Sequence, residues 1–268
     1  MGSAPYVSVV IPAFRAETTI RRAIESVLHS GLPVLDVEIV IASDDGRDYA
    51  ALVPREFRLT QAAPGPVATG VGAARNRAVD VATGQFLAFL DADDTWEPGY
   101  LSVALATARL AGLVFTPTRV LRNGSEILRT LGGARMTLHD LASTGASHHP
   151  VVARGLVGRF RDGPSQDVLH AVELLTMHGG SAAASARAYE IHIRDGSVSR
   201  SAGFARKVDN AYREIAREIA TGGTRVPPAW QKEAAEVFHA KRALNSAFAR
   251  SSAPGFYEFV AEKRGVAA

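Results

Sequence analysis

Phe86-Leu87-Ala88-Phe89-Leu90-Asp91-Ala92-Asp93-Asp94 is the stretch that decides the fold, because five apolar residues run directly into an acidic cluster. A short apolar run of this kind is typical of a strand buried on both faces of a sheet. In open α/β sheets, ligands bind outside the carboxyl ends of the strands, which is where these acids stand. Alternate residues of an extended chain share a face, so Asp91 and Asp93 can direct both carboxylates at one hard cation. We therefore expect a buried strand that ends in a candidate metal site.

A simpler interpretation is that Asp93-Asp94-Thr95 forms a polar turn, which caps a helix expected to begin near Pro98. An isolated Asp-x-Asp pair is a weak signal. Its placement directly after an apolar strand favours the ligand site.

The residues around this stretch alternate between strand and helix patterns. Residues 7–11 and 37–41 are short, β-branched apolar runs, as buried strands are. Residues 18–30, 72–82 and 98–111 have the pattern of helices. This order predicts an α/β domain with a mostly parallel central sheet flanked by helices.

The alternation weakens after residue 115. Residues 117–165 are rich in Gly, Arg, Thr and His, and we expect loops with short strands there. Farther along, the periodicity predicts helices at 167–177, 206–220 and 230–250, and a short strand at 190–194.

Composition excludes several classes of protein. The chain has 268 residues, 47% of them apolar, which is ample to bury a core. It contains no cysteine, so any metal must be held by carboxylate, imidazole or water. The net charge is only +3 and no basic stripe with interleaved aromatics stands out, so we expect no nucleic-acid partner. No apolar run reaches membrane length and residues 1–6 do not resemble a signal peptide, so the expected location is cytoplasmic.

A second acidic pair, Asp44-Asp45, follows the strand predicted at 37–41. The carboxyl ends of parallel strands meet at one edge of a sheet. Both acidic groups are therefore expected at the same ligand-binding edge.

Four blocks cover roughly residues 6–101: Val7-Ser8-Val9-Val10-Ile11-Pro12-Ala13-Phe14, Ile39-Val40-Ile41-Ala42-Ser43-Asp44-Asp45-Gly46, Gly72-Ala73-Ala74-Arg75-Asn76-Arg77-Ala78, and Gly84-Gln85 followed by the opening stretch. In order and spacing they resemble the family-two glycosyltransferases of the GT-A fold. Each block alone is weak evidence, but the joint match is specific. The resemblance implies a GT-A (Rossmann-like) fold with an acceptor-side region and C-terminal helices. It also implies an inverting transferase that uses a nucleotide-activated sugar and usually Mg²⁺ or Mn²⁺.

The resemblance also divides the chain. Residues 1–115 correspond to the nucleotide-sugar-binding half, and residues 116–203 to the acceptor-binding and catalytic half of the same domain. Residues 204–268 form a C-terminal helical extension.

The same resemblance assigns roles to residues of the four blocks. It implies that Asp44 or Asp45 accepts a hydrogen bond from the base, most naturally uracil N3–H, and that Asp93 ligates the metal. Asp91 contacts ribose or metal, and the remaining nucleotide-binding positions are Pro12, Ala13, Phe14, Arg75 and Ala92. The chain departs from the family at Arg15, where Asn is common, and in the Asp44 loop, which is one residue shorter. Which of the two acids faces the base is therefore open.

Direct displacement at an anomeric carbon needs one general base for the acceptor hydroxyl. Residues 165–173 resemble the family block that supplies it, with Gln166 in place of the usual Glu, so Asp167 is the candidate base. The preceding residues 159–162 resemble the segment that leads into this acid. A simpler interpretation is an Asp that stabilises the start of a helix through the helix dipole.

Residues 189–200 resemble the family's late strand and loop, which closes over the diphosphate. The alternation of this segment places His192 and Arg194 on one face, and Arg194 or Arg200 is positioned to neutralise the leaving group. A lone His is more often structural than a ligand, so contact between His192 and metal or phosphate is the weaker interpretation. His148 and His149 are adjacent and would point in opposite directions, so we expect acceptor-site or loop residues rather than a shared ion site.

The helices after Arg200 are basic and aromatic. Such a tail suits a membrane surface that carries a lipid-linked acceptor. Packing of these helices on the catalytic domain is the simpler interpretation. The expected partners are a nucleotide-sugar donor and a glycan, glycolipid or small-molecule acceptor, while the oligomeric state is left open.

Two other classes of function are compatible with a strand-end acid pair. A sugar nucleotidyltransferase usually carries a glycine-rich basic loop after its first strand, whereas residues 12–17 here contain no glycine. A non-catalytic nucleotide-sugar-binding relative would have no use for a base at Asp167.

Overall fold

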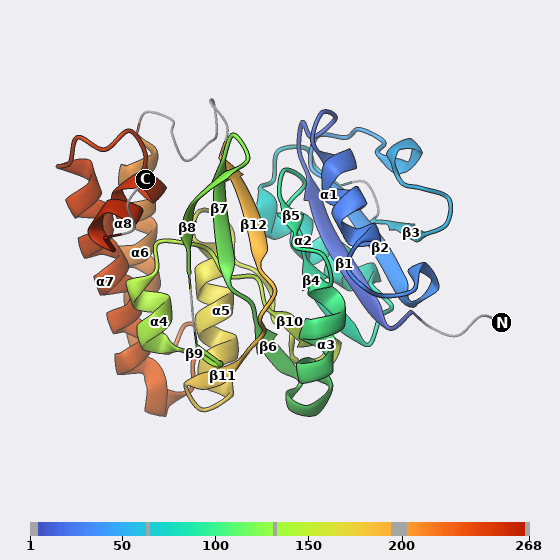
Figure 1. Ribbon diagram of the computed structural model, residues 1–268. Coiled ribbons are helices and arrows are strands. Elements are labelled where there is room, and N and C mark those ends of the chain that lie inside the picture. Colours follow the sequence, from blue (N-terminus) through green and yellow to red (C-terminus); the bar gives the residue numbers. More distant parts are fainter. Residues whose placement is uncertain (1–4, 63–64, 131–132, 194–202, 266–268) are drawn as a thin grey trace.

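The computed structural model describes residues 5–62, 65–130, 133–193 and 203–265. Its main sheet has eight strands (Figure 1), in the spatial order β3 (Arg58–Gln61), β2 (Val37–Ser43), β1 (Val7–Ala13), β4 (Phe86–Phe89), β10 (Val151–Ala153), β6 (Leu113–Phe115), β11 (Ser181–Ala184) and β9 (Arg135–Thr137). Neighbouring strands are parallel except at β10 and β9: β10 runs antiparallel to both β4 and β6, and β9 antiparallel to β11. The expectation of a mostly parallel central sheet is confirmed.

Strand β1 is buried along its whole length because both faces of the sheet are covered. On one face, Val10 packs in a core with α2 (Val71–Val81) and α5 (Gln166–Met177). On the other face, Val9 packs in a core with α1 (Ile20–Leu28) and α3 (Tyr100–Ala111). This two-sided burial explains why the strand is apolar at most positions rather than alternating, with the hydroxyl of the buried Ser8 hydrogen-bonded to Glu38.

A second, four-stranded sheet has the order β5 (Thr95–Trp96), β12 (Tyr189–Ile193), β7 (Thr118–Arg122) and β8 (Ser125–Arg129). Figure 1 shows α6 (Phe204–Ala220), α7 (Gln231–Ala249) and α8 (Phe256–Lys263) gathered beside it, at the end of the molecule farthest from the N-terminus. Val120 and Leu128 of the second sheet form a small core with Phe259 and Val260 of α8. The C-terminal helices are therefore packed onto the rest of the protein. No helix in the described part of the chain is long and apolar enough to cross a membrane.

Several elements went unpredicted. Residues 117–165, expected to be loops with short strands, also contain helix α4 (Leu138–Ser143). Thr137 and Asp140 form a capping box at its start, a Thr-x-x-Asp signal that was available in the sequence. Strands β3 and β11 and helix α8 were also missed. β3 is half-exposed at a sheet edge and β11 is mostly alanine, so neither has the apolar pattern of a buried strand.

Gly84 marks the point where the chain turns from α2 into β4, directly against β1. A Cβ at this position would lie 2.5 Å from the Ser8 backbone nitrogen and 2.7 Å from the Val7 carbonyl carbon. Strand β1 cannot retreat, because it is hydrogen-bonded to strands on both sides. We expect Gly84→Ala to lower the free energy of unfolding by about 3 kcal/mol in urea denaturation.

Gly155 provides the matched control, because a Cβ there would meet no atom within 4 Å. Gly155→Ala should change the free energy of unfolding by less than about 0.5 kcal/mol. Equal stability of the two variants would contradict this account of Gly84.

Candidate active site

The site lies at the carboxyl edge of the main sheet. Val10 of β1 pairs with Val40 of β2 on one side and with Phe89 of β4 on the other. The three parallel strands therefore end side by side. The residues that follow them, beginning at Phe14, Asp44 and Leu90, share one edge, as predicted.

The end of β1 places Pro12 and Ala13 in the interior and turns Phe14 outward, with 47% of its surface exposed. The Arg15 guanidinium carbon lies 5.1 Å from the centre of the Phe14 ring. The Arg15 backbone has φ +50°, in the left-handed region that Asn tolerates better than most residues. This gives a physical reason for the Asn that is common here in the family.

Asp44 and Asp45, after β2, are both bonded to protein groups. The buried Asp44 carboxylate accepts hydrogen bonds from the backbone nitrogens of Thr69 (3.0 Å) and Gly70 (2.8 Å), where α2 begins. Asp45 accepts from the Arg15 nitrogen at 2.6 Å and the Tyr49 hydroxyl at 2.8 Å. Burial works against ionisation of Asp45, but these hydrogen bonds outweigh it and lower its pKa. Contact of either acid with a base stays a prediction.

Arg75 of α2 is buried, with 1% of its surface exposed, and its Nη2 donates to Asp91 Oδ1. The guanidinium carbon lies 5.4 Å from the centre of the Phe160 ring. Burial alone would lower the pKa of Arg75, but the charges of Asp91 and Asp167 raise it above its ordinary value. Among the described residues, Arg75 Nε and Nη1 have no hydrogen-bond partner. Arg75 is therefore a permanent buried cation with unused donors, bonded to Asp91 and favoured by the charge of Asp167.

His149 lies beside the second carboxylate oxygen of Asp91. Its Nε2 lies 3.9 Å from Asp91 Oδ2, and its ring centre is 4.7 Å from that of Tyr189. Burial lowers the pKa of His149, with Asp91 acting in the opposite direction. His148 points elsewhere: its ring is hydrogen-bonded to Thr144 Oγ1 at 3.1 Å. The two adjacent rings therefore have separate partners, Thr144 for His148 and Asp91 for His149.

The acids after β4 are held by β12. The Tyr189 hydroxyl donates to Asp94 Oδ2 at 2.9 Å, and the His192 backbone nitrogen donates to Asp94 Oδ1 at 3.0 Å. Burial, followed by the charges of Asp93 and Asp91, raises the pKa of Asp94 well above its ordinary value. Ala92 is buried and Asp93 is half-buried. Asp94 is thus buried against β12, whereas Asp91 and Asp93 are half-buried and lie nearer the surface.

His192 lies beside this cluster, with Nε2 2.8 Å from Thr95 Oγ1. Arg194 and Arg200, proposed for the diphosphate, lie outside the described residues. Within the described ranges, no group of three or more His, Asp and Glu is arranged to hold a metal ion by protein ligands alone.

Asp167 stands in the first turn of α5, as predicted, and is half-buried. Burial by itself raises its pKa, but His149, Arg75 and a hydrogen bond from the Ser147 side chain outweigh that effect. The net result is a pKa below the ordinary value, so Asp167 is ionised at neutral pH. Arg75 and His149 therefore connect the strand-end acid Asp91 to the helix-start acid Asp167.

Three residues near Asp167 were missed as site residues because they come from the C-terminal helices. Lys241 of α7 is buried, and its Nζ donates to the Thr144 carbonyl oxygen at 2.9 Å. Burial lowers the pKa of Lys241 to about 8, with Asp167 acting in the opposite direction. The pKa values of Tyr212 and Tyr257 are raised mainly by burial and also by the negative charge of acids that include Asp167. No local motif marks these positions, which only helix packing brings together.

Comparison with known proteins places the chain in a family. The model of "Glycosyl transferase family 2" matches residues 8–161, more than half of the 268-residue chain. The glucosyltransferase WfgD of Escherichia coli is 27% identical over 139 residues, which cover 50% of this chain and 54% of WfgD. The amylovoran biosynthesis glycosyltransferase AmsB of Erwinia amylovora is 32% identical over 130 residues, covering 44% of this chain and 43% of AmsB. The chain thus spans about half the length of these curated relatives.

Solved structures show the same fold over nearly the whole chain. Staphylococcus aureus TarS (residues 1–349, with UDP-GlcNAc) gives a TM-score of 0.65 at 20% identity, covering 93% of this chain and 74% of that one. The mannosyltransferase PcManGT of Pyrobaculum calidifontis, with GDP-Man and Mn²⁺, gives a TM-score of 0.53 at 18% identity, covering 98% and 81%. With the strand-end acids at the expected sheet edge, these matches lead to one conclusion: the chain belongs to glycosyl transferase family 2 and has the GT-A fold.

Proposed function

We propose that the protein transfers a sugar from a nucleoside diphosphate donor of the uridine type to an acceptor hydroxyl, with inversion at the anomeric carbon. Asp167 acts as the general base, and Asp91 and Asp93 hold Mg²⁺ or Mn²⁺. The observation that carries this proposal is the convergence of Asp91 and Asp167 on the buried cation Arg75. A donor-side acid and an acceptor-side base within reach of one cation are what a single displacement requires.

A divalent cation fits the donor set at the end of β4. Asp91 and Asp93 offer the oxygen ligands that Mg²⁺ and Mn²⁺ prefer, and the neighbouring Asp94 is occupied by Tyr189 and the His192 backbone nitrogen. With few protein ligands, phosphate oxygens of the donor and water would complete the coordination shell. Such a cation supplies charge neutralisation for the departing diphosphate.

The chain's own residues supply the proton transfer. Asp167 is ionised at neutral pH because its pKa is lowered, so one of its oxygens can accept the acceptor's hydroxyl proton. The acceptor oxygen then forms its bond to the anomeric carbon from the side opposite the diphosphate. The bond between that carbon and the diphosphate oxygen breaks, and its electron pair leaves with the nucleoside diphosphate. No protein acid is needed for this departure.

For the acceptor we propose a hydroxyl on a glycan, a glycolipid or a small molecule, used on the cytoplasmic side of a membrane. The relative WfgD is named for an acceptor linked to diphosphoundecaprenol. The packing of the aromatic residues in the C-terminal helices indicates whether these helices could dock on a membrane directly. Phe248 lies 5.5 Å from Phe256 and 5.8 Å from Phe259 between ring centres, and Phe238 is fully buried. Phe259 is buried, and Phe248 and Phe256 are half-buried against one another, which favours packing on the protein over a membrane-docking face.

Nucleotide binding gives the first test of this proposal. We expect UDP with Mn²⁺, at 100 times its dissociation constant, to add about 2.7 kcal/mol of stability. For a chain of this size that corresponds to a rise in Tm of roughly 5 to 10 °C. Asp93→Ala should abolish the part of the rise that depends on Mn²⁺, because it removes a metal ligand.

Asp36→Ala is the matched control, since Asp36 is exposed and lies directly before the amino end of β2. It should leave the Mn²⁺-dependent rise unchanged. If UDP, GDP and TDP with metal all leave Tm unchanged, the donor assignment is wrong. Release of pyrophosphate instead of UDP during turnover would favour a nucleotidyltransferase.

A further inference from the structure

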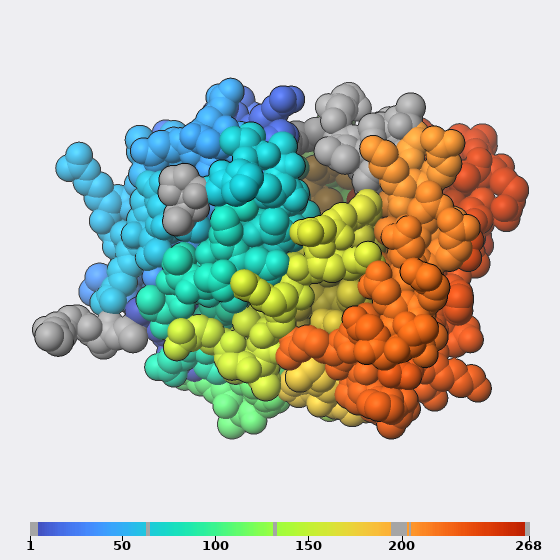
Figure 2. Space-filling view, turned by 180° about the vertical axis from the view of Figure 1, so that it is seen from behind, coloured from blue at the N-terminus to red at the C-terminus, as the bar shows by residue number. Residues whose placement is uncertain are grey.

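A cavity apart from the candidate active site lies on the face of the molecule shown in Figure 2, and none of the roles proposed above involves it. It has a volume of about 830 Å³, within the range of small-molecule sites. One wall is the segment 157–161, which we call the strap. The opposite wall comes from Glu218 near the end of α6 and from residues 223–225 in the turn that follows. The described residues that line the cavity include neither Asp91, Asp93 nor Asp167.

The strap separates this cavity from the active site. Its Phe160 lines the cavity, while the same ring lies beneath the Arg75 guanidinium and stacks on His170, with ring centres 4.2 Å apart. The strap is fastened to α2 by a pair of hydrogen bonds. Asn76 Nδ2 donates to the Phe160 carbonyl oxygen and Asn76 Oδ1 accepts from the Phe160 nitrogen, each at 2.8 Å. Phe160 therefore lines the cavity and also contacts Arg75 of the candidate active site.

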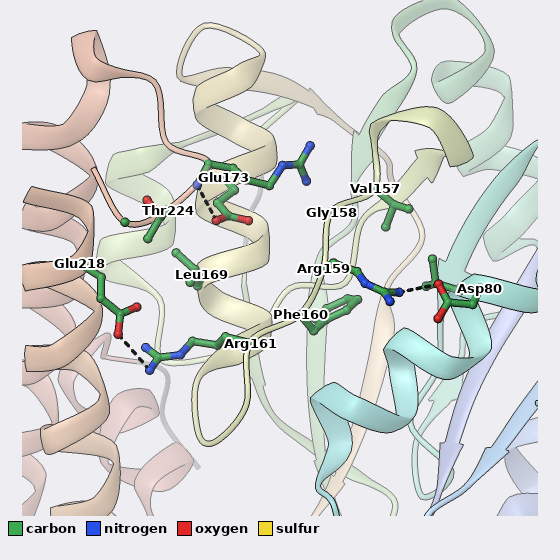
Figure 3. A pocket seen from close by; sticks show the side chains of 13 residues that line it. Asp80, Val157, Gly158, Arg159, Phe160, Arg161, Leu169, Glu173, Glu218 and Thr224 are labelled. Atoms are coloured by element: carbon green, nitrogen blue, oxygen red, sulfur yellow. Dashed lines mark hydrogen bonds and ion pairs between the residues drawn. The ribbon is translucent and has the colours of Figure 1, made fainter. Parts of the chain in front are cut away.

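The charges around the cavity are balanced. Figure 3 shows Arg159 paired with Asp80 at the edge, and Arg161 paired with Glu218 of α6 at 3.4 Å. Glu173 of α5 accepts a hydrogen bond from the Arg225 backbone nitrogen at 3.0 Å. The lining thus carries three arginines and three acids. Such a lining has no strong preference for an anion or a cation.

The polar groups of this lining have hydrogen-bonding capacity left over. Arg161 Nη1 is buried without a hydrogen-bond partner among the described residues. Glu173 is 5% exposed, and burial raises its pKa although the Arg225 nitrogen donates to it. A carboxylate can accept about four hydrogen bonds and a guanidinium can donate five. Vicinal hydroxyl groups both donate and accept, so they can satisfy a neighbouring arginine and acid together.

Apolar side chains complete the lining. Val79, Val157 and Leu169 contribute a surface against which the C–H face of a sugar ring can pack. A neutral, polyhydroxylated ligand with one apolar face matches this combination better than a phosphate, which would meet Glu173 and Glu218. The volume admits more than one sugar ring.

We propose that this cavity binds a disaccharide-sized segment of a glycan, outside the catalytic site. The inference rests on the proposed function, because a glycan-transferring enzyme meets such chains as acceptor or product. A chain held here keeps the glycan on the enzyme while the active site opens for the next donor.

The test measures saccharide binding rather than transfer. Cellobiose, laminaribiose and N,N′-diacetylchitobiose at 10 mM are followed by saturation-transfer difference NMR, with and without saturating UDP and Mn²⁺. We expect at least one to bind, with a signal that persists in the presence of UDP. Thr224→Trp, which fills the cavity, should weaken this binding at least tenfold. Thr221→Trp is the matched control, since Thr221 is exposed and does not line the cavity, and it should leave binding unchanged.

Each other outcome overturns the proposal. Displacement of the saccharide by UDP would place it in the active site. A signal unaffected by Thr224→Trp would place it elsewhere on the surface. Binding of inorganic phosphate that is lost in Thr224→Trp, without saccharide binding, would make the cavity an anion site. Absence of any saccharide signal also rejects it. A failure of the proposed function would give a different result. Nucleotides would then leave Tm unchanged, while the saccharide would still give its NMR signal.

Discussion

Asp167→Asn is expected to lower kcat by about 10² to 10⁴, the usual cost of losing a general base. The substitution keeps the size of the side chain and removes its charge and basicity. Asp167 faces the acceptor side, so the affinity for UDP with Mn²⁺ should change by less than about threefold. The measurements are steady-state release of UDP and calorimetric titration with UDP. A loss of kcat without a loss of affinity for UDP would identify Asp167 as a base rather than as a residue that binds the nucleotide.

The stability of the Asp167→Asn variant distinguishes a catalytic role from a merely structural one at the start of α5. A helix-dipole effect is worth only about 0.3 to 1 kcal/mol, so the variant should stay folded. Asp162→Asn is the matched control, because Asp162 is exposed and lies five residues before Asp167. It should retain near-normal turnover. Normal turnover in Asp167→Asn with a collapse in Asp162→Asn would transfer the role to Asp162.

Arg75→Met is expected to have the largest effect on the architecture of the site. The guanidinium is buried and bonded to Asp91, and the charge of Asp167 also acts on it, so its removal takes a favourable cation away from both carboxylates. Removing one partner of a buried ion pair costs about 3 to 5 kcal/mol, and the partial exposure of Asp91 places the expected loss near 3 kcal/mol. The pKa of Asp167 should rise, because a cation that favours its ionised form is gone. The acid limb of the pH–rate profile should therefore move to higher pH.

A double-mutant cycle isolates the pair. Arg75→Met combined with Asp91→Asn should be destabilised by less than the sum of the two single variants, because each single variant leaves one charge of the pair without its partner and the double variant removes both. Arg159→Met is the control. Its pair with Asp80 lies at the surface, where such pairs contribute about 0 to 1 kcal/mol. Strict additivity of Arg75→Met and Asp91→Asn would show that the guanidinium does not act through Asp91.

The first half of the fold was predictable because its signals are local. Five-residue apolar runs form β1, β2 and β4, and helical spacing between them forms α1 and α2. The acids after β2 and β4 must then meet at one edge, since parallel neighbours share a direction. The candidate base Asp167 came instead from the resemblance of residues 165–173 to a block of the family, and its place in the first turn of α5 agrees with the helix expected there. The second half lacked such signals: its strands are short, and half-exposed or alanine-rich.

What the sequence by itself determined is therefore the parallel core, the acidic edge and the candidate base. What only the tertiary structure decided is which groups surround that base. Strand β10 is inserted antiparallel between β4 and β6, so its amino end lies beside the carboxyl end of β4, and His149 arrives at Asp91. Helix α7 brings Lys241 to the Thr144 carbonyl from 97 positions away in the chain. The strap closes over α2 through Asn76 and leaves a cavity behind it. These contacts depend on the order and direction of the strands and on how the helices pack. Burial of apolar surface over the whole molecule selects that arrangement, and no short stretch of residues encodes it.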